Sequence, residues 1–111
     1  MTEYLYDSQG VWIAFRADAQ ARHVFNSEGD WIGWFPWEDD DAVTPDGEYL
    51  GTVVGDRLLL REGHPFRGTP GYPGAPTYLG RPSYPGAAPF TSLPSGFDDV
   101  PSAYLWPRVP S

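Results

Sequence analysis

Few side chains of this 111-residue chain combine the type and the spacing that catalysis or metal binding requires. The two histidines, His23 and His64, could each act as a general base or a metal ligand. Neither stands at the spacing from Glu, Asp or a second histidine that a zinc site needs. Both histidines are therefore expected to have structural or surface roles.

An acidic run at Glu38–Asp41 offers the carboxylate oxygens that bind Ca²⁺, but it lacks the alternating pattern of a calcium loop. Ser8 and Ser27 stand in polar turns, and turn chemistry explains them without a nucleophilic role. No glycine-rich loop leads into a helix, so nucleotide binding has no support. The sequence predicts no catalytic residue, no cofactor and no metal, and hence no enzyme.

Aromatic side chains are the remaining candidates for a binding site. Four tryptophans share one stretch of the chain, at Trp12, Trp31, Trp34 and Trp37. If they are exposed, they form a stacking platform for sugars or a peptide; if they are buried, they fill a small core. A domain this small needs large aromatic side chains to bury enough apolar area, which favours the core.

The charge of the chain is concentrated in its first part. Residues 1–67 carry thirteen Asp or Glu against five Arg, which accounts for the whole formal net charge of −8. An acidic surface repels phosphate groups, so neither nucleic acid nor a membrane is an expected partner. The absence of lysine excludes Schiff-base chemistry, and the absence of cysteine excludes disulfides and thiolate metal sites.

The sequence shows no targeting signal. Its first residues lack the basic start and the continuous apolar run of a signal peptide. No stretch approaches the ~20 apolar residues of a membrane helix. The protein is therefore expected in the cytoplasm.

A phrase repeated at intervals of 16 to 19 residues must position the aromatic side chains. Its parts are an apolar residue, a polar turn ending in Gly, a spacer, an aromatic, an aliphatic and then Ala or Gly. The copies lie at Tyr6–Phe15, Phe25–Trp34, Val43–Thr52 and, in shortened form, Leu60–Phe66. The turns suit a type I turn closed by a left-handed glycine, so the pattern predicts β-hairpins.

The strand after each turn is apolar on both faces. In the first copy the alternation predicts one face of Val11, Ile13 and Phe15 and another of Trp12 and Ala14. The small residue recurs at one slot, at Ala14, Gly33 and Gly51, which indicates close approach of neighbouring repeats around a shared axis. Because one hairpin cannot bury its own face, several hairpins must stack, and a lone module would expose an apolar face.

From Gly68 a second repeat of six residues begins. Glycine opens each hexad, and its fifth place is aromatic, at Tyr72, Tyr78, Tyr84 and Phe90. A polyproline II helix would place all four on one edge. The composition is also typical of a disordered linker, but a linker has no need to keep aromatics in register. We therefore expect the aromatic edge of the tail to pack against the domain or another subunit. The apolar and aromatic end at 97–106 is expected to anchor the tail in the same way.

The hairpin phrase, Tyr6-Asp7-x-x-Gly10 followed by aromatic, aliphatic and Ala, resembles the bacterial 4-fold β flower domain family. The resemblance covers residues 4–66 and, more loosely, 67–96. It implies four β-hairpin repeats about a pseudo-fourfold axis, followed by a proline-rich tail. It brings a fold but no established activity and no site residues.

The sequence therefore predicts an all-β hairpin-repeat domain at 1–66 and an extended Pro/Gly/Tyr-rich tail at 67–111, packed on the domain or on another subunit. The expected function is a structural or protein-interaction module that self-associates through apolar strand faces and the aromatic edge of the tail. Candidate interaction residues are Trp34, Trp37, Tyr72, Tyr78, Tyr84 and Phe90. The alternative is a module that binds a small ligand or a peptide in an aromatic pocket.

Overall fold

The computed structural model describes residues 2–18, 21–37, 39–63, 67–68, 70–71, 73–74, 76, 80 and 82–106. Within these residues the protein is all-β, as predicted, with eight strands and one short 3-10 helix. The elements are β1 (Glu3–Tyr6), β2 (Trp12–Arg16), β3 (His23–Asn26), β4 (Trp31–Trp34), β5 (Asp41–Val43), β6 (Tyr49–Val54), β7 (Arg57–Arg61), β8 (Phe97–Asp99) and η1 (Ser102–Leu105).

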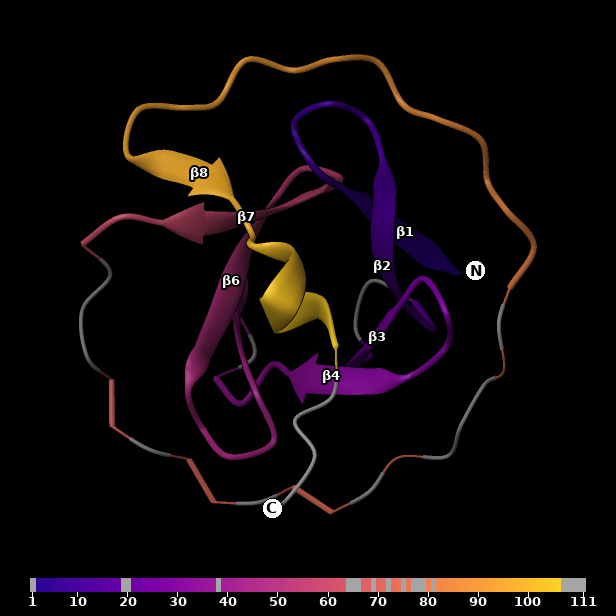
Figure 1. Ribbon diagram of the computed structural model, residues 1–111. Coiled ribbons are helices and arrows are strands. Elements are labelled where there is room, and N and C mark those ends of the chain that lie inside the picture. The colour runs from indigo at the N-terminus through magenta and orange to yellow at the C-terminus, as the bar shows by residue number, and fades with distance from the viewer. Residues whose placement is uncertain are drawn as a thin grey trace.

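The strands form one sheet that closes on itself (Figure 1). Strands β1 to β7 pair with their sequence neighbours in antiparallel order, and Tyr6 of β1 pairs in parallel with Arg57 of β7. The Tyr6 amide donates to the carbonyl of Asp56 at 2.9 Å. This pairing closes a seven-strand barrel, to which β8 is added beside β7.

Three hairpin turns are built alike, as the sequence predicts. In each, the turn glycine donates to the carbonyl three residues before it at 2.9–3.1 Å, from Gly10 to Asp7, Gly29 to Asn26 and Gly47 to Thr44. The side-chain oxygens of Asp7 and Asn26 each accept two further backbone N–H groups. The glycine φ angles of +85° to +89° confirm the left-handed closing position.

A β-bulge follows the turn in each of these hairpins. In β2, Leu5 pairs with Ala14 and Tyr6 pairs with Trp12, which leaves Ile13 as the extra residue. The same register shift leaves out Ile32 in β4 and Leu50 in β6. A bulge interrupts the alternation of side chains along a strand. The side chain of the aliphatic residue in each phrase therefore does not point to the face that strict alternation predicts.

The apolar side chains form two buried clusters. The larger contains Leu5, Ile13, Ala14, Val24, Ile32, Phe35, Ala42, Leu50, Val53, Leu58 and Val100. The second contains Trp12, Phe15, Phe25 and Trp31, with Tyr4 and Tyr6 packed against it. The predicted strict alternation in β2 is therefore wrong, because the bulge moves Ile13 to the cluster of Ala14 and away from that of Phe15.

The small-residue slot marks close contact between neighbouring strands, as the sequence indicates. A Cβ atom on Gly33 would overlap the carbonyl oxygen of Val43 in β5 and lie 2.7 Å from Leu50. A Cβ atom on Gly51 would lie 3.1 Å from the carbonyl oxygen of Leu59 in β7. The slot thus lets one hairpin approach the next; a fourfold axis of repeats stays a prediction.

Strand β7 pairs with a strand that comes from much later in the chain. The end of the predicted fourth copy, at residues 64–66, lies outside the described residues. Residues 59–61 of β7 pair instead with 97–99 of β8, with Leu60 opposite Asp98. The predicted anchoring of 97–106 is confirmed, since Val100 is buried and Leu105 packs against the larger cluster. The domain boundary at residue 66 stays a prediction.

The described residues between 67 and 95, here called the belt, run around the outside of the strands (Figure 1). The glycines that open its hexads have φ between +75° and +89°, at Gly68, Gly74, Gly80 and Gly86. Polyproline II requires φ near −75°, so the prediction of a continuous polyproline II helix is wrong. A glycine with positive φ at every sixth residue changes the direction of the chain, and these repeated bends let the belt curve around the barrel. The chain then returns through β8 to η1, which overlies the middle of the strand ring in this view.

The contact at the small-residue slot predicts the effect of Gly33→Ala. The added methyl group has to displace the backbone of β5, so we expect a loss of about 1–3 kcal/mol in the free energy of unfolding. Thermal denaturation followed by circular dichroism measures the effect. Gly71→Ala is the control, because a Cβ there meets no atom within 4 Å. Equal melting temperatures for the two variants would contradict the close approach of β4 and β5.

Candidate functional site

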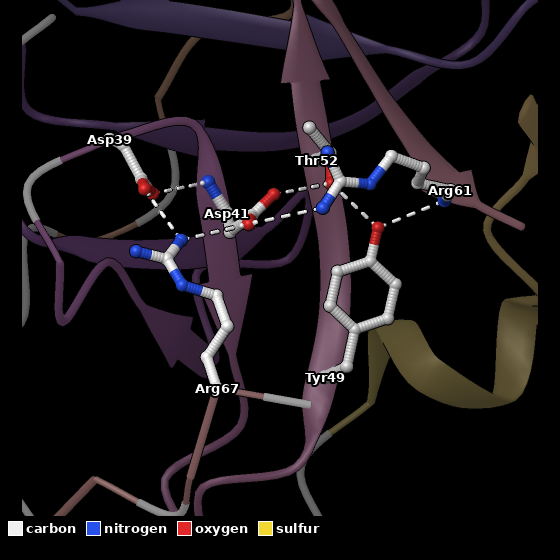
Figure 2. A network of polar contacts seen from close by, with 6 residues as sticks. All are labelled: Asp39, Asp41, Tyr49, Thr52, Arg61 and Arg67. Atoms are coloured by element: carbon white, nitrogen blue, oxygen red, sulfur yellow. Dashed lines mark hydrogen bonds and ion pairs between the residues drawn. The ribbon is translucent and has the colours of Figure 1, made fainter. Parts of the chain in front are cut away.

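A largely buried carboxylate, Asp41, organises a polar network where the acidic loop meets the start of the belt (Figure 2). Asp41 begins β5 and lies opposite Thr52 of β6, so the register of this hairpin brings the two side chains together. The Thr52 hydroxyl donates to Asp41 Oδ1 at 2.8 Å. The Tyr49 hydroxyl lies 2.6 Å from that of Thr52 and accepts the Arg61 amide at 2.9 Å. The network therefore ties β5, β6 and β7 together.

Two arginines balance the acidic side of the network. Arg61 lies 3.6 Å from Asp41 Oδ2. Arg67, the first described residue of the belt, donates to Asp41 Oδ2 at 3.0 Å and to Asp39 Oδ2 at 2.6 Å (Figure 2). Its guanidinium also lies 4.2 Å from the centre of the Trp37 ring. Two carboxylates and an indole thus hold Arg67, and charge-assisted hydrogen bonds of this kind are among the stronger ones in proteins.

The pairing with Arg67 lowers the pKa of Asp39. Partial burial acts to raise the pKa of Asp39, but hydrogen bonds from Arg67 and from the Asp41 amide, with the charges of Arg67 and Arg61, outweigh it. The net effect holds the Asp39 pKa below its ordinary value of 3.8. The hydrogen bond to Asp39 correspondingly raises the pKa of Arg67. The network therefore acts as a charged clamp on the start of the belt.

A second candidate site is a pocket of about 190 Å³ between β2, the turn after β3 and η1. Its lining residues are Trp12, Ile13, Asn26, Ser27, Ser102, Leu105 and Trp106. The side-chain amide of Asn26 donates to the carbonyl of Leu105 at 2.8 Å, which positions η1 over the pocket. The indole N–H of Trp12 donates to the carbonyl of Ala14, so this ring presents apolar surface. The pocket combines two indoles with the hydroxyls of Ser27 and Ser102.

The structure buries three of the four candidate tryptophans and leaves the fourth half-buried. Trp12, Trp31 and Trp34 are buried, which confirms the core interpretation for these three. The indole N–H of Trp34 has no hydrogen-bond partner within the described part of the chain. Trp37 is half-buried beneath Arg67 at the start of the belt.

Of the four aromatic residues of the hexads, Tyr84 and Phe90 lie in the described part of the belt, and both are exposed. The Tyr84 ring lies 6.1 Å from that of Trp12, so it also touches the barrel at β2. Tyr72 and Tyr78 lie outside the described residues. The predicted single aromatic edge can therefore be followed only at Tyr84 and Phe90.

Sequence reasoning missed the pairing of Ser8 with Asp99. The Ser8 amide donates to Asp99 Oδ1 at 2.8 Å, and its hydroxyl donates to Oδ2 at 2.7 Å. The two residues are 91 positions apart, and the turn chemistry of Ser8 explains its type without a distant partner. Only the apolar character of the following residues indicated that this part of the tail docks.

Within the described residues, no group of three or more His, Asp or Glu side chains could hold a metal ion. The same residues contain no helix long and apolar enough to cross a membrane. No protein-family model, curated protein or solved structure matches the chain. The resemblance to the 4-fold β flower domain family and the cytoplasmic location stay predictions.

The charged clamp predicts a pH dependence that Arg67→Gln reduces, because the Asp41 amide and the charge of Arg61 still act on Asp39. Because the folded-state pKa of Asp39 is depressed, its stabilising contribution is complete above the ordinary value of 3.8 and is lost as the pH falls toward the folded-state pKa. In Arg67→Gln we expect the Asp39 pKa to rise, as measured by carboxyl NMR titration. Arg22→Gln, with the same loss of charge, is the control. An unchanged Asp39 titration in Arg67→Gln would contradict the clamp.

Proposed function

We propose that this protein is a non-enzymatic interaction module that associates with further copies of itself through apolar side chains on its belt. The observation that carries the proposal is a set of exposed large apolar side chains on the belt and on the first hairpin turn. They are Val11, Tyr84, Phe90 and Leu93, with exposed fractions of 55%, 69%, 64% and 40%. Single exposed apolar residues are ordinary, but three of these lie on one stretch of the belt and the fourth on the hairpin turn bonded to it, and such a group is typical of an interaction surface.

Backbone hydrogen bonds bring the belt to the first hairpin and so gather these side chains. The Ala88 amide donates to the carbonyl of Gly10, and the Thr91 amide donates to the carbonyl of Ser8, both at 2.9 Å. Phe90 lies between the two bonded belt residues, and Val11 follows Gly10 directly. The exposed side chains are thus presented by an anchored backbone, which lowers the entropy cost of binding a partner.

We place the contact between copies on the belt and not on the strand faces. Self-association through apolar strand faces is the expectation from the sequence, but the side chains of both clusters are buried within the single chain. Strand faces that are already covered offer no apolar area for a partner to bury. The exposed belt side chains remain as the available surface.

The net charge of −8 sets the conditions for association. Copies with the same charge repel each other, and this repulsion weakens as salt shortens the Debye length to about 8 Å at physiological ionic strength. The proposal therefore expects association to strengthen as salt is raised. The carboxylates of the Asp41 network are paired with arginines and a hydroxyl, which supports a structural rather than a catalytic role for them.

Sedimentation velocity over a range of concentrations tests the proposal. Native protein is expected to form dimers or larger species at high concentration, whereas Tyr84→Ser/Phe90→Ser is expected to associate less strongly because the apolar contact surface is lost. Tyr104→Ser, which removes an exposed aromatic from η1 and not from the belt, is the matched control. A native protein that stays monomeric at high salt and high concentration would rule the proposal out.

The second candidate function is the binding of a small ligand or a peptide in the pocket under η1. The specific observation in its favour is the exposed indole of Trp106, which shares the pocket with Trp12, Ser27 and Ser102. Flat indole faces stack on sugar rings, prolines and aromatic groups, while hydroxyl groups fix orientation. The acidic chain favours neutral or cationic ligands over anions.

Tryptophan fluorescence tests this second candidate. Titration with a panel of neutral glycans and proline-rich peptides is expected to change the emission of the native protein. The change should disappear in Trp106→Ala and persist in Trp37→Ala, because Trp37 packs beneath Arg67 and does not line the pocket. A spectrum that no member of the panel alters would count against ligand binding at this pocket.

A further inference from the structure

The segment from β8 through η1, residues 97–106, is here called the C-terminal segment. It packs against residues far away in the sequence, and these residues together are called the groove here. Its β8 pairs with residues 59–61 of β7. The Asp99 carboxylate accepts both hydrogen bonds from Ser8 in the first turn. The carbonyl of Leu105 accepts the side-chain amide of Asn26 in the turn after β3. The groove therefore recognises an extended strand with a carboxylate at one defined place.

Few apolar side chains anchor this segment. Val100 is buried and lies 3.2 Å from the position of a Cβ atom on Gly51. Leu105 is half-buried against the larger cluster, whereas residues 101–104 and Trp106 are exposed. A segment with so few buried contacts opens at a lower free energy than the barrel, whose strands pair with neighbours on both sides.

When the segment leaves, hydrogen-bonding groups of the groove lose their partners. The outer edge of β7 would present unpaired N–H and C=O groups, which is a template for another strand. The amide of Ser8 and the side chain of Asn26 would lose the acceptors that they have in Asp99 and Leu105. The occupant that restores every one of these contacts is the same segment from a second copy of this chain.

The connection to the barrel is long enough for such an exchange. Residues 62–96, 35 in number, join β7 to β8, although adjacent antiparallel strands are ordinarily joined by 2–5 residues. A chain of this length can span about 115 Å when extended. The whole molecule measures 35 × 33 × 29 Å, so the segment can reach the groove of a neighbouring copy.

We propose that the C-terminal segment is exchanged between two copies, each inserting its β8 and η1 beside β7 of the other. The exchanged dimer restores the contacts that the C-terminal segment makes in the monomer, whereas the belt has to release its hydrogen bonds from Ala88 to Gly10 and from Thr91 to Ser8. High concentration favours the dimer, because the exchange joins two copies. It requires the groove at β7, Ser8 and Asn26 and does not use the exposed belt side chains. The proposal therefore stands apart from the surface association suggested above.

Two single-cysteine variants test the exchange, because the native chain has no cysteine. Leu60 and Asp98 are directly paired between β7 and β8, so Leu60→Cys and Asp98→Cys place thiols within disulfide reach only when these strands pair. The two variants, one with a mass tag, are mixed at high concentration and high salt and then oxidised. A disulfide-linked product of mixed mass on a non-reducing gel is the expected result.

Two controls make the result specific. Asp40→Cys mixed with Asp98→Cys should give no more than background cross-linking, because the pairs Asp41–Thr52, Thr52–Leu59 and Leu59–Asp99 separate these positions by three strand spacings, about 14 Å. The double variant Leu60→Cys/Asp98→Cys should close within one chain in dilute solution, which verifies the register.

The outcomes separate the exchange from surface association. The mixed product should persist when Tyr84→Ser/Phe90→Ser is added to both variants, since those residues lie outside the groove. Ser8→Ala removes the same hydrogen bond to Asp99 from the monomer and from the exchanged dimer, so the mixed product should form faster, because the segment opens more easily, and reach a similar final amount. Efficient closure of the double variant, together with a mixture that gives no mixed product at any concentration, would overturn the exchange.

Discussion

The closure of the strand ring between β1 and β7 is the constraint on which the rest of this structure depends. Each hairpin is apolar on both faces, so a single hairpin cannot bury itself. The pairing of Tyr6 with Arg57 joins the first strand to the seventh and encloses the larger cluster. A closed sheet also removes most of the free strand edge that would attract other chains.

Closure in turn depends on how closely the hairpins approach one another. The bulges at Ile13, Ile32 and Leu50 direct the aliphatic residue of each phrase into the larger cluster. The neighbouring glycine slots admit the backbone of the next strand. The indoles of Trp12 and Trp31 donate to the carbonyls of Ala14 and Gly33, both at 2.8 Å, so the largest side chains lie along their own strands. One local sequence pattern therefore provides the core side chains, the bulges in the strands and the close contact between neighbouring hairpins.

The belt and the C-terminal segment form a second layer, and polar contacts rather than apolar area locate it. Arg67 is held by Asp39 and Asp41 at the start, and Asp99 is held by Ser8 at the end. Charged and backbone hydrogen bonds are directional, so they can fix the path of a segment that buries few side chains of its own. The same layer leaves Tyr84, Phe90 and Trp106 exposed, which is why the proposed surface association and the proposed ligand pocket both involve this layer.

The sequence by itself determined the hairpins, their turns and the burial of Trp12, Trp31 and Trp34, because these follow from short-range rules. The Asp, Asn and Thr residues that begin the turns and the glycines that close them act within five positions of the chain. It could not determine that Ile13 leaves the face of Phe15, that β8 pairs with β7, or that Asp99 meets Ser8. Those features depend on register and ring closure between residues up to 91 positions apart, and such contacts leave no local periodic signal. Only the tertiary structure, in which the closed barrel offers one free stretch of β7, decides where the end of the chain goes.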